Sequence, residues 1–260
     1  KILIIGKKSF LGSNLKNFLS KFYKVDNLSY EQIIKKKNIF FVNYSHIINT
    51  AIHPKYIKSK YNKKFDLDRN FIQKFKNYKF FYIFFNTRKI YTPKENINER
   101  SKISPIDTYA KNKLITEKYL KKKVKKKYVS LRISNIIGRR IFKNNRNNHK
   151  LFFDNYLYYK KIKDFKLVIN NDFKDFLSID QFCLIIKKII ELNLQGTYNV
   201  SIAKKIYLSE LIKWLDESLS RKIKFKQSSK NSFTLKNSKL IKKIRIKITK
   251  NQLKKFCERL

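Results

Sequence analysis

Short runs rich in apolar side chains alternate along this chain with longer segments in which apolar side chains recur every three or four residues. The apolar runs are typical of buried strands, and they lie at residues 2–5, 23–25, 47–50, 80–85 and 128–133. The helical patterns lie at about residues 10–21, 64–77 and 106–122. Strands that alternate with helices predict a parallel sheet with helices on both faces. We therefore expect a doubly wound α/β domain over residues 1–138.

Beyond about residue 139 the pattern becomes that of a smaller, mixed part. It predicts a helix at 151–160, a strand at 166–169 and helices at 179–193 and 208–219. We expect residues 139–260 to form a small substrate-binding part. Segments at about 166–180 are expected to return to the first domain.

A glycine turn follows the first predicted strand. Gly6 comes directly after the apolar run, and Gly12 lies at the start of an amphipathic helix. A strand, a glycine turn and a helix N-terminus form an anion site, because free N–H groups and the helix dipole point at the ligand. Asp26 lies about 20 residues beyond Gly6, where it can accept hydrogen bonds from a ribose diol. The pattern favours a Rossmann-type dinucleotide site, with an ordinary strand–turn–helix as the alternative.

Tyr109 and Lys113 are a candidate proton-transfer pair. They lie four residues apart, which places both side chains on one face of a helix. An ammonium near a phenol favours the phenolate, so we expect Lys113 to lower the pKa of Tyr109 toward neutral pH. Tyr56 and Lys60 have the same spacing in this lysine-rich chain. The spacing alone therefore leaves a packed helix aromatic as the alternative.

Lysine dominates the composition. The chain has 63 Lys and Arg against 18 Asp and Glu, a formal charge of +45. So basic a balance suggests nucleic acid or an anionic membrane surface as a partner. The lysines are scattered along the whole chain, however, and Asn, Ile, Phe and Tyr are abundant where Ala, Gly and Pro are scarce. This pattern favours codon bias, and we expect no dedicated nucleic-acid site.

The sequence also bears on where the protein is located and on whether it binds a metal. We expect no membrane span and no signal peptide, because no apolar run has the required length or cleavage pattern. Cys183 and Cys257 are widely separated, which fits a reducing cytosol and a cytoplasmic protein. The three histidines have no metal-ligand spacing, so we expect no metal site.

The motifs, taken in order, resemble the extended short-chain dehydrogenase/reductase family, which includes nucleotide-sugar epimerases, dehydratases and reductases. The turn Gly6-Lys-Lys-Ser9-Phe-Leu-Gly12 resembles the family's Gly-x-x-Gly-x-x-Gly, with Ser9 at the middle glycine. Further matching segments lie at 25–29, 47–51, 84–91, 131–138, 174–180 and 196–200. The ordered set covers about residues 1–245.

The resemblance implies a site for NAD and a nucleotide-linked sugar. The implied cofactor-binding residues are Gly6, Ser9, Phe10, Leu11, Gly12, Asp26, Asn27, Ala51 and Lys113. NAD is favoured because Asp26 would repel a 2′-phosphate, and NADP stays the alternative because Lys8 lies in the turn. The implied substrate-binding residues are Asn135 and Lys174. The family also allows a homodimer.

The resemblance further implies reversible hydride transfer at a sugar carbon. Tyr109 would move the proton, Lys113 would bind the nicotinamide ribose, and Thr87 would hydrogen-bond the substrate oxygen. Arg88 and Lys89 stand where the family's 4,6-dehydratases carry an Asp-Glu pair, so we expect a 4-epimerase or a 4-keto-sugar reductase. A non-catalytic cofactor-binding protein, or a basic nucleic-acid binder on the same scaffold, is the alternative.

Overall fold

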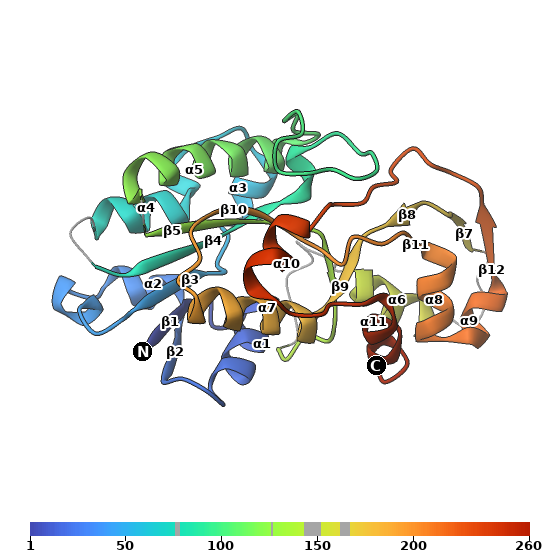
Figure 1. Cartoon of the computed structure of the whole chain (residues 1–260), viewed down its shortest axis with the longest axis horizontal. Coiled ribbons are helices and arrows are strands. Elements are labelled where there is room, and N and C mark those ends of the chain that lie inside the picture. The colour runs from blue at the N-terminus through green and yellow to red at the C-terminus, as the bar shows by residue number, and fades with distance from the viewer. Residues whose placement is uncertain (76–78, 126, 143–151, 162–166) are drawn as a thin grey trace.

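A central sheet covered by helices forms the larger part of the molecule, and a smaller part lies at one end of it (Figure 1). The computed structural model describes residues 1–260 except 76–78, 126, 143–151 and 162–166. The sheet strands are β1 (Ile2–Ile5), β2 (Val25–Leu28), β3 (His46–Asn49), β4 (Phe81–Thr87), β5 (Tyr128–Ile133) and β10 (Gly196–Val200). The accompanying helices are α1 (Phe10–Leu19), α2 (Tyr30–Ile34), α3 (Pro54–Lys58), α4 (Leu67–Lys74), α5 (Thr108–Val124), α7 (Ile179–Glu191) and α10 (Ser238–Ile244). Short 3₁₀ turns are η1 (Asn38–Phe41), η2 (Lys63–Phe65) and η3 (Arg88–Ile90).

The sheet has the order β10-β5-β4-β3-β1-β2, and every pairing in it is parallel. The predicted Rossmann-type, doubly wound fold is therefore confirmed. Ile5 pairs with Leu28 on one side and Asn49 on the other, so the carboxyl ends of these strands share one edge. The chain runs outward from β1 to β2 and then crosses back to β3. In open α/β sheets, ligands bind at such a reversal of strand order.

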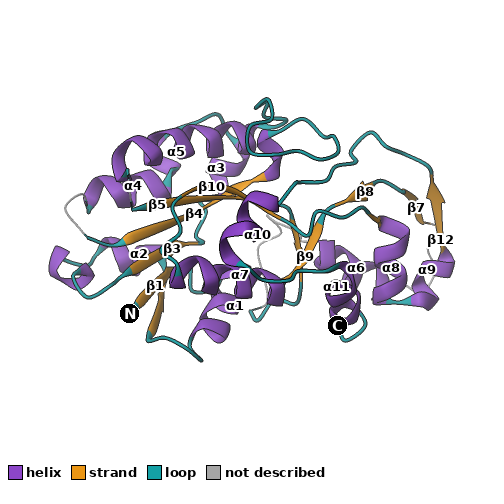
Figure 2. Ribbon diagram, viewed as in Figure 1, coloured by secondary structure: helices purple, strands orange, loops and turns teal. Residues whose placement is uncertain are grey.

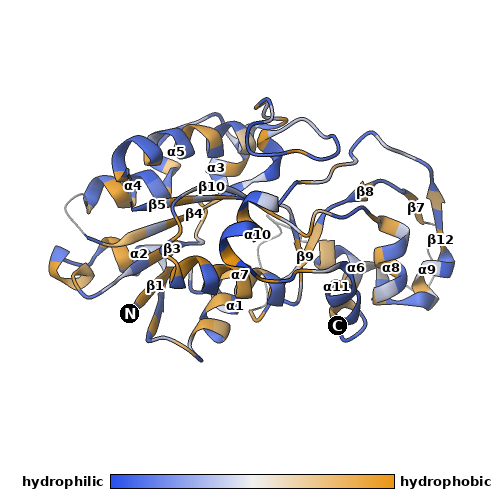
Figure 3. Cartoon of the chain, viewed as in Figure 1, coloured by the Kyte–Doolittle hydropathy of each residue, from blue (hydrophilic) through white to orange (hydrophobic). Residues whose placement is uncertain are grey.

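Two apolar layers explain why the first strand is wholly apolar. Ile2 and Ile4 face the cluster formed with α1 and α7, whereas Leu3 and Ile5 face the cluster beneath α4 and α5. Because side chains alternate along a strand and both faces are covered, every position of β1 is buried. Figure 2 shows the helices on the two faces, and Figure 3 shows the apolar stretches of the sheet between them.

The smaller part is built from short strand pairs and helices. Its strands are β6 (Asn135–Ile137), β7 (Leu167–Asn170), β8 (Phe173–Lys174), β9 (Phe176–Ser178), β11 (Ile206–Tyr207) and β12 (Ile223–Lys226). Its helices are α6 (Phe152–Lys161), α8 (Leu208–Leu215), α9 (Glu217–Lys222) and α11 (Lys250–Cys257). The strands pair as β6–β9, β8–β11 and β7–β12, outside the central sheet.

Two observed regions differ from the sequence expectations. The strand of the C-terminal half that joins the central sheet is β10, whereas the strands at 167–178 pair within the smaller part. The expected helix at 208–219 is two helices, because Asp216 has an extended backbone and caps α9 through the Leu219 N–H. The first residue of the expected 151–160 helix, and the end of the 64–77 helix, fall outside the described residues. The domain boundary near residue 138 remains a prediction.

Within the described residues, no helix combines the length and the apolar character that a membrane crossing requires. Cys183 and Cys257 are both buried and unbridged. Cys183 lies on the buried side of α7 and belongs to the core.

A buried histidine should make stability depend on pH. His46 opens β3 and is only 5% exposed, and burial lowers the pKa of its imidazole to about 4 from 6.5. Between these values the unfolded chain binds the proton and the folded chain does not, so stability falls as pH drops from about 6.5 to 4. The expected loss attributable to His46 is up to about 3 kcal/mol.

The measurement is urea unfolding of the wild type and of His46→Gln across this pH range. The variant lacks the titrating group, so its unfolding free energy should fall less steeply with acid than that of the wild type. Parallel curves for the two proteins would contradict the assignment.

Candidate active site

The glycine turn after β1 brings α1 into direct contact with the end of β3. Gly6 has φ +114°, and a Cβ there would lie 2.4 Å from Thr50 Oγ1 and 2.9 Å from the Ala51 nitrogen. A Cβ on Gly12 would lie 2.5 Å from the Gly6 carbonyl oxygen and 2.6 Å from Thr50 Oγ1. Only glycine fits at both positions. The N-terminus of α1, with Phe10 and Leu11 in its first turn, therefore sits directly over the switch point of the sheet.

Ser9 fits the middle position of the turn without strain. Its backbone has φ −73°, so no glycine is needed there. Its hydroxyl caps α1 by accepting the Gly12 N–H at 2.9 Å and lies 2.6 Å from Thr50 Oγ1. Thr50 in turn donates to the Ile5 carbonyl at 2.7 Å. Ser9 and Thr50 thus connect the turn to the end of β3. The sequence analysis did not identify Thr50 as part of this site.

Asp26 and Asn27 lie at the end of β2, beside the turn. Asp26 forms an ion pair with Lys1 at 2.7 Å and accepts a hydrogen bond from Tyr44, both through Oδ2. Burial acts to raise the pKa of Asp26, but Lys1 and Tyr44 outweigh it and hold the pKa below its ordinary value. The carboxylate is therefore charged at neutral pH.

The side-chain oxygen of Asn27 is an acceptor without a donor among the described residues. Its Nδ2 lies 3.4 Å from the Gly12 carbonyl oxygen, whereas its buried Oδ1 has no hydrogen-bond partner among the described residues. A buried acceptor without a donor is costly, and a ligand N–H or O–H would satisfy it. This orphaned acceptor and the tight glycine turn fit an NAD nucleotide.

Tyr109 and Lys113 lie in the first two turns of α5, which Asp107 caps through the Ala110 N–H at 2.8 Å. Tyr109 is half-buried, and Lys113 is 3% exposed. The Lys113 ammonium lies 3.7 Å from Asp68 Oδ2 and 4.5 Å from the centre of the Phe84 ring. The predicted pair is thus carried by one helix, and Asp68 and Phe84 fix the position of the lysine ammonium.

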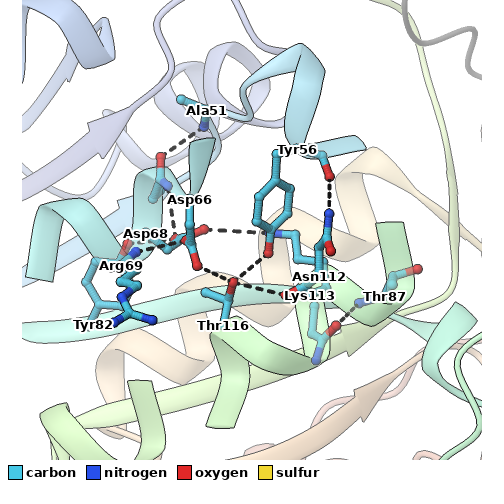
Figure 4. A network of polar contacts seen from close by, with 12 residues as sticks. Ala51, Tyr56, Asp66, Asp68, Arg69, Tyr82, Thr87, Asn112, Lys113 and Thr116 are labelled. Carbon is cyan, nitrogen blue, oxygen red and sulfur yellow. Dashed lines mark hydrogen bonds and ion pairs between the residues drawn. The ribbon is translucent and has the colours of Figure 1, made fainter. Parts of the chain in front are cut away.

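Asp68 is fixed by two further groups. Its Oδ1 accepts hydrogen bonds from Asn49 Nδ2 at 2.9 Å and from the Tyr82 hydroxyl at 2.7 Å (Figure 4). Asn49 also accepts the Ala51 N–H at 3.0 Å. The end of β3, helix α4 and Lys113 are therefore parts of one buried network. Asp68 and Lys113 also line a small crevice that includes Ala51, the predicted cofactor contact just beyond the end of β3.

A second layer of the network fixes α5 against the segment after β3. Thr116 donates to Asp66 Oδ2 at 2.6 Å and lies 2.6 Å from the Tyr56 hydroxyl. Asn112 Nδ2 donates to the carbonyls of Tyr56 and Ser59, at 2.8 and 2.9 Å. Figure 4 shows these groups converging beside Lys113. The helix that carries the tyrosine is held in place by buried polar contacts.

The expectation that Lys113 lowers the pKa of Tyr109 below its ordinary value is wrong for the protein alone. Burial raises this pKa, and the Asp68 and Asp107 carboxylates act in the same direction. Lys113 acts to lower it and is outweighed. The sequence showed the cation four residues away but not the carboxylates that the fold brings beside it. Tyr109 is consequently a neutral phenol, and a proton donor, at neutral pH.

Thr87 ends β4 and lies against the start of α5. Its Oγ1 accepts the Lys89 N–H at 3.2 Å and so caps η3. Lys89 forms an ion pair with Asp107, the cap of α5, at 2.8 Å. These contacts bring the Thr87 segment beside the turn that carries Tyr109. Among the described residues no acceptor takes the hydrogen of the threonine hydroxyl.

The two predicted substrate residues border this region from the smaller part. Asn135 lies two residues beyond Ile133, which pairs with Thr87 in the sheet. The Nδ2 of Asn135 lies 3.3 Å from the Asp175 carbonyl oxygen. Lys174 precedes Asp175 on β8 and is half-buried. Burial lowers the pKa of its ammonium, and the charge of Arg88 adds to the effect.

Fold and site together define a Rossmann-type nucleotide-binding protein with a Tyr-x-x-x-Lys helix beside its cofactor edge. The sequence profile of the NAD dependent epimerase/dehydratase family matches residues 2–201. The chain belongs to this family, as the resemblance to extended short-chain dehydrogenases/reductases predicted. Its cofactor is accordingly a nicotinamide dinucleotide.

Solved structures of the family share the fold over nearly the whole chain. UDP-N-acetylglucosamine 4-epimerase from Methanobrevibacter ruminantium M1 is 17% identical, with a TM-score of 0.80 and coverage of 99% of this chain and 96% of that one. dTDP-4-dehydrorhamnose reductase from Clostridium acetobutylicum is 16% identical, with a TM-score of 0.74 and coverage of 98% and 97%.

A dehydratase has the same TM-score as the reductase. dTDP-glucose 4,6-dehydratase from Bacillus anthracis, in complex with NAD, is 14% identical, with a TM-score of 0.74 and coverage of 99% and 94%. A comparison with curated protein sequences gives no match. At these identities the structures establish the fold, and they do not separate the three reactions.

Proposed function

We propose that this chain is an NAD-dependent enzyme that transfers hydride reversibly at a carbon of a nucleotide-linked sugar. The observation that carries the proposal is the arrangement of Tyr109, Lys113 and Thr87. The first two share one face of α5, and the Lys89–Asp107 ion pair ties the third to the start of that helix. All three lie at the strand edge that also carries the glycine turn.

Each side chain has a defined part in the reaction. Bound NAD supplies the hydride acceptor or donor. Tyr109 moves the proton of the sugar hydroxyl or ketone through its phenol oxygen. Thr87 donates a hydrogen bond to the same substrate oxygen and orients it. Lys113, held by Asp68, places a positive charge beside the phenol and is positioned to bind the nicotinamide ribose.

Reduction of a 4-keto sugar and 4-epimerisation both need this set of residues. The neutral phenol of Tyr109 favours the reductive direction, because a ketone needs a proton donor as the hydride arrives. A 4,6-dehydratase is disfavoured, because Arg88 and Lys89 offer no carboxylate for elimination. Lys89 is already paired with Asp107.

The testing experiment combines mass spectrometry with an activity screen. Protein purified under native conditions is examined for retained NAD, which an epimerase keeps and a reductase exchanges. It is then incubated with UDP-, dTDP- and GDP-linked sugars and their 4-keto forms, with NAD(P)H, and products are identified by NMR. Absence of both cofactor binding and turnover across this panel would refute the proposal.

The alternative, a basic nucleic-acid binder on this scaffold, is distinguished by salt. Its binding to nucleic acid should weaken steeply between 50 and 200 mM salt, by about 10³-fold or more if many phosphates are contacted. Binding of a nucleotide sugar should depend much less on salt. A cytoplasmic location and a homodimer remain predictions.

The choice between NAD and NADP should depend on Asp26. Its charged carboxylate favours the ribose diol of NAD and repels a 2′-phosphate, so Asp26→Ala should weaken NAD binding more than NADP binding. Both affinities can be measured by isothermal titration calorimetry. Asp180→Ala, which removes an exposed carboxylate from α7, is the matched control. An unchanged ratio of the two affinities in Asp26→Ala would remove this assignment.

A further inference from the structure

Two half-buried cations, Arg88 and Lys174, have no carboxylate partner within the described residues and are close enough for the charge of Arg88 to act on Lys174. Arg88 follows Thr87 directly, and its guanidinium carbon lies 3.9 Å from the centre of the Phe233 ring. Its Nη1 is buried and has no hydrogen-bond partner among the described residues. Lys174, the second cation, forms no ion pair with a described carboxylate.

The positive charges of Arg88 and Lys174 repel one another. Burial lowers the pKa of Arg88 to about 10, and both burial and the charge of Arg88 lower the pKa of Lys174. The nearby carboxylates are already engaged. Asp107 binds Lys89 and caps α5, and Asp172 accepts hydrogen bonds from the Ser228 hydroxyl and the Asn231 N–H.

A desolvated guanidinium with an unused N–H is expensive unless an anion compensates it. Its planar fork matches a carboxylate, which it binds through two parallel hydrogen bonds. A neutral sugar hydroxyl would satisfy one N–H but would leave the charge unpaired. The pair of cations therefore indicates an anionic ligand group.

The position of Arg88 assigns that group to the substrate. The cofactor features, namely the glycine turn and Asn27, lie over β1 and β2. Arg88 instead begins η3 at the end of β4, and Lys174 belongs to the smaller part. Arg88 is also the residue next to Thr87, which contacts the reacting sugar oxygen in the proposed function. The anion thus lies beside the reacting end of the sugar.

We propose that Arg88, together with Lys174, binds a carboxylate on the sugar ring, so that the substrate is a nucleotide-linked uronic acid or a related acidic sugar. This inference rests on the proposed function and adds the substrate class. The diphosphate of the nucleotide is the other source of negative charge near the site. The experiment separates the two sources.

The test is calorimetric titration of the NAD-loaded protein with UDP-glucuronate, UDP-glucose and UDP. The first two differ only at C6, which is a carboxylate in one and a hydroxymethyl group in the other, and UDP carries the nucleoside and the diphosphate without a sugar. The wild type should bind UDP-glucuronate at least about 30-fold more tightly than UDP-glucose, the scale of a buried charge pair. Arg88→Met, which keeps an apolar contact for Phe233, should remove that preference and leave UDP binding unchanged.

Two variants make the result specific. Arg100→Met removes one exposed arginine and should behave like the wild type. Arg88→Lys keeps the charge without the fork, so it should recover only part of the preference. Native circular dichroism and NAD affinity establish that each variant is folded.

Three outcomes would overturn the inference. Equal wild-type binding of UDP-glucuronate and UDP-glucose excludes a carboxylate site while leaving the proposed function standing. A parallel loss of UDP, UDP-glucose and UDP-glucuronate binding in Arg88→Met assigns the anion to the diphosphate. If the NAD-loaded protein binds none of the three compounds, and none of the dTDP- or GDP-linked sugars of the activity screen, the inference and the proposed function fail together.

Discussion

Replacing Tyr109 with Phe should reduce turnover of the nucleotide-sugar substrate by about 10²–10⁴-fold, the usual contribution of general acid–base catalysis. The change removes one hydroxyl from a half-buried ring and leaves the ring itself, so packing of α5 should be almost unaltered. Cofactor affinity should stay near the wild-type value, because the phenol acts on the substrate. Steady-state kinetics and NAD titration measure the two quantities separately.

Two neighbouring variants should divide these effects differently. Lys113→Ala should lower both turnover and cofactor affinity, because its ammonium lies beside the phenol and is proposed to bind the nicotinamide ribose. Thr87→Val should slow turnover with little change in cofactor affinity. Tyr158→Phe, at a tyrosine that is 56% exposed on α6, is the matched control and should be fully active. A fully active Tyr109→Phe enzyme would require a different catalytic group.

The fold could be predicted from the chain because its strands are buried on both faces. A strand such as β1 lies between two helical layers, so it is a continuous apolar run that stands out even in a lysine-rich sequence. The smaller part gave weaker signals. Its strands pair in twos over two to four residues, which is too short for a pattern to emerge. The division of the 208–219 helix depends on one capping side chain, Asp216.

The candidate site could be predicted only where its residues lie close in sequence. Tyr109 and Lys113 form such a pair, as do the glycines of the first turn. The groups that set their chemistry come from elsewhere in the chain. Asp68 reaches Lys113 from α4, and Thr50 closes the glycine turn from the end of β3. An acidic residue within a helical pattern, in a chain with 18 acids against 63 basic residues, was the signal that could have singled out Asp68.

The same distinction explains the error over Tyr109. A helical spacing identifies a cation one turn away, and it carries no information on burial or on carboxylates from other elements. In the folded protein, burial and the carboxylates of Asp68 and Asp107 outweigh the lysine and raise the pKa of the phenol. The spacing identifies Tyr109 as a candidate, whereas its protonation state required the tertiary structure.

Replacing Gly12 with Val should lower NAD affinity at least about 100-fold, the scale of about 3 kcal/mol of overpacking. A Cβ at this position would lie 2.5 Å from the Gly6 carbonyl oxygen, 2.6 Å from Thr50 Oγ1 and 2.7 Å from Ser9 Oγ. The backbone carbonyl cannot rotate away as a flexible side chain can. Helix α1 must therefore move outward and carry its N-terminal N–H groups away from the pyrophosphate position.

Folding and binding have to be separated for this variant. Far-UV circular dichroism and thermal unfolding report whether the sheet and its helices persist, and Gly12→Ala gives a smaller perturbation of the same contact. Asn17→Val, which places a valine at an exposed position of the same helix, is the matched control and should bind NAD normally. A folded Gly12→Val protein with wild-type NAD affinity would show that the turn after β1 does not hold the pyrophosphate. The cofactor would then have to bind away from the switch point, which the orphaned acceptor of Asn27 argues against.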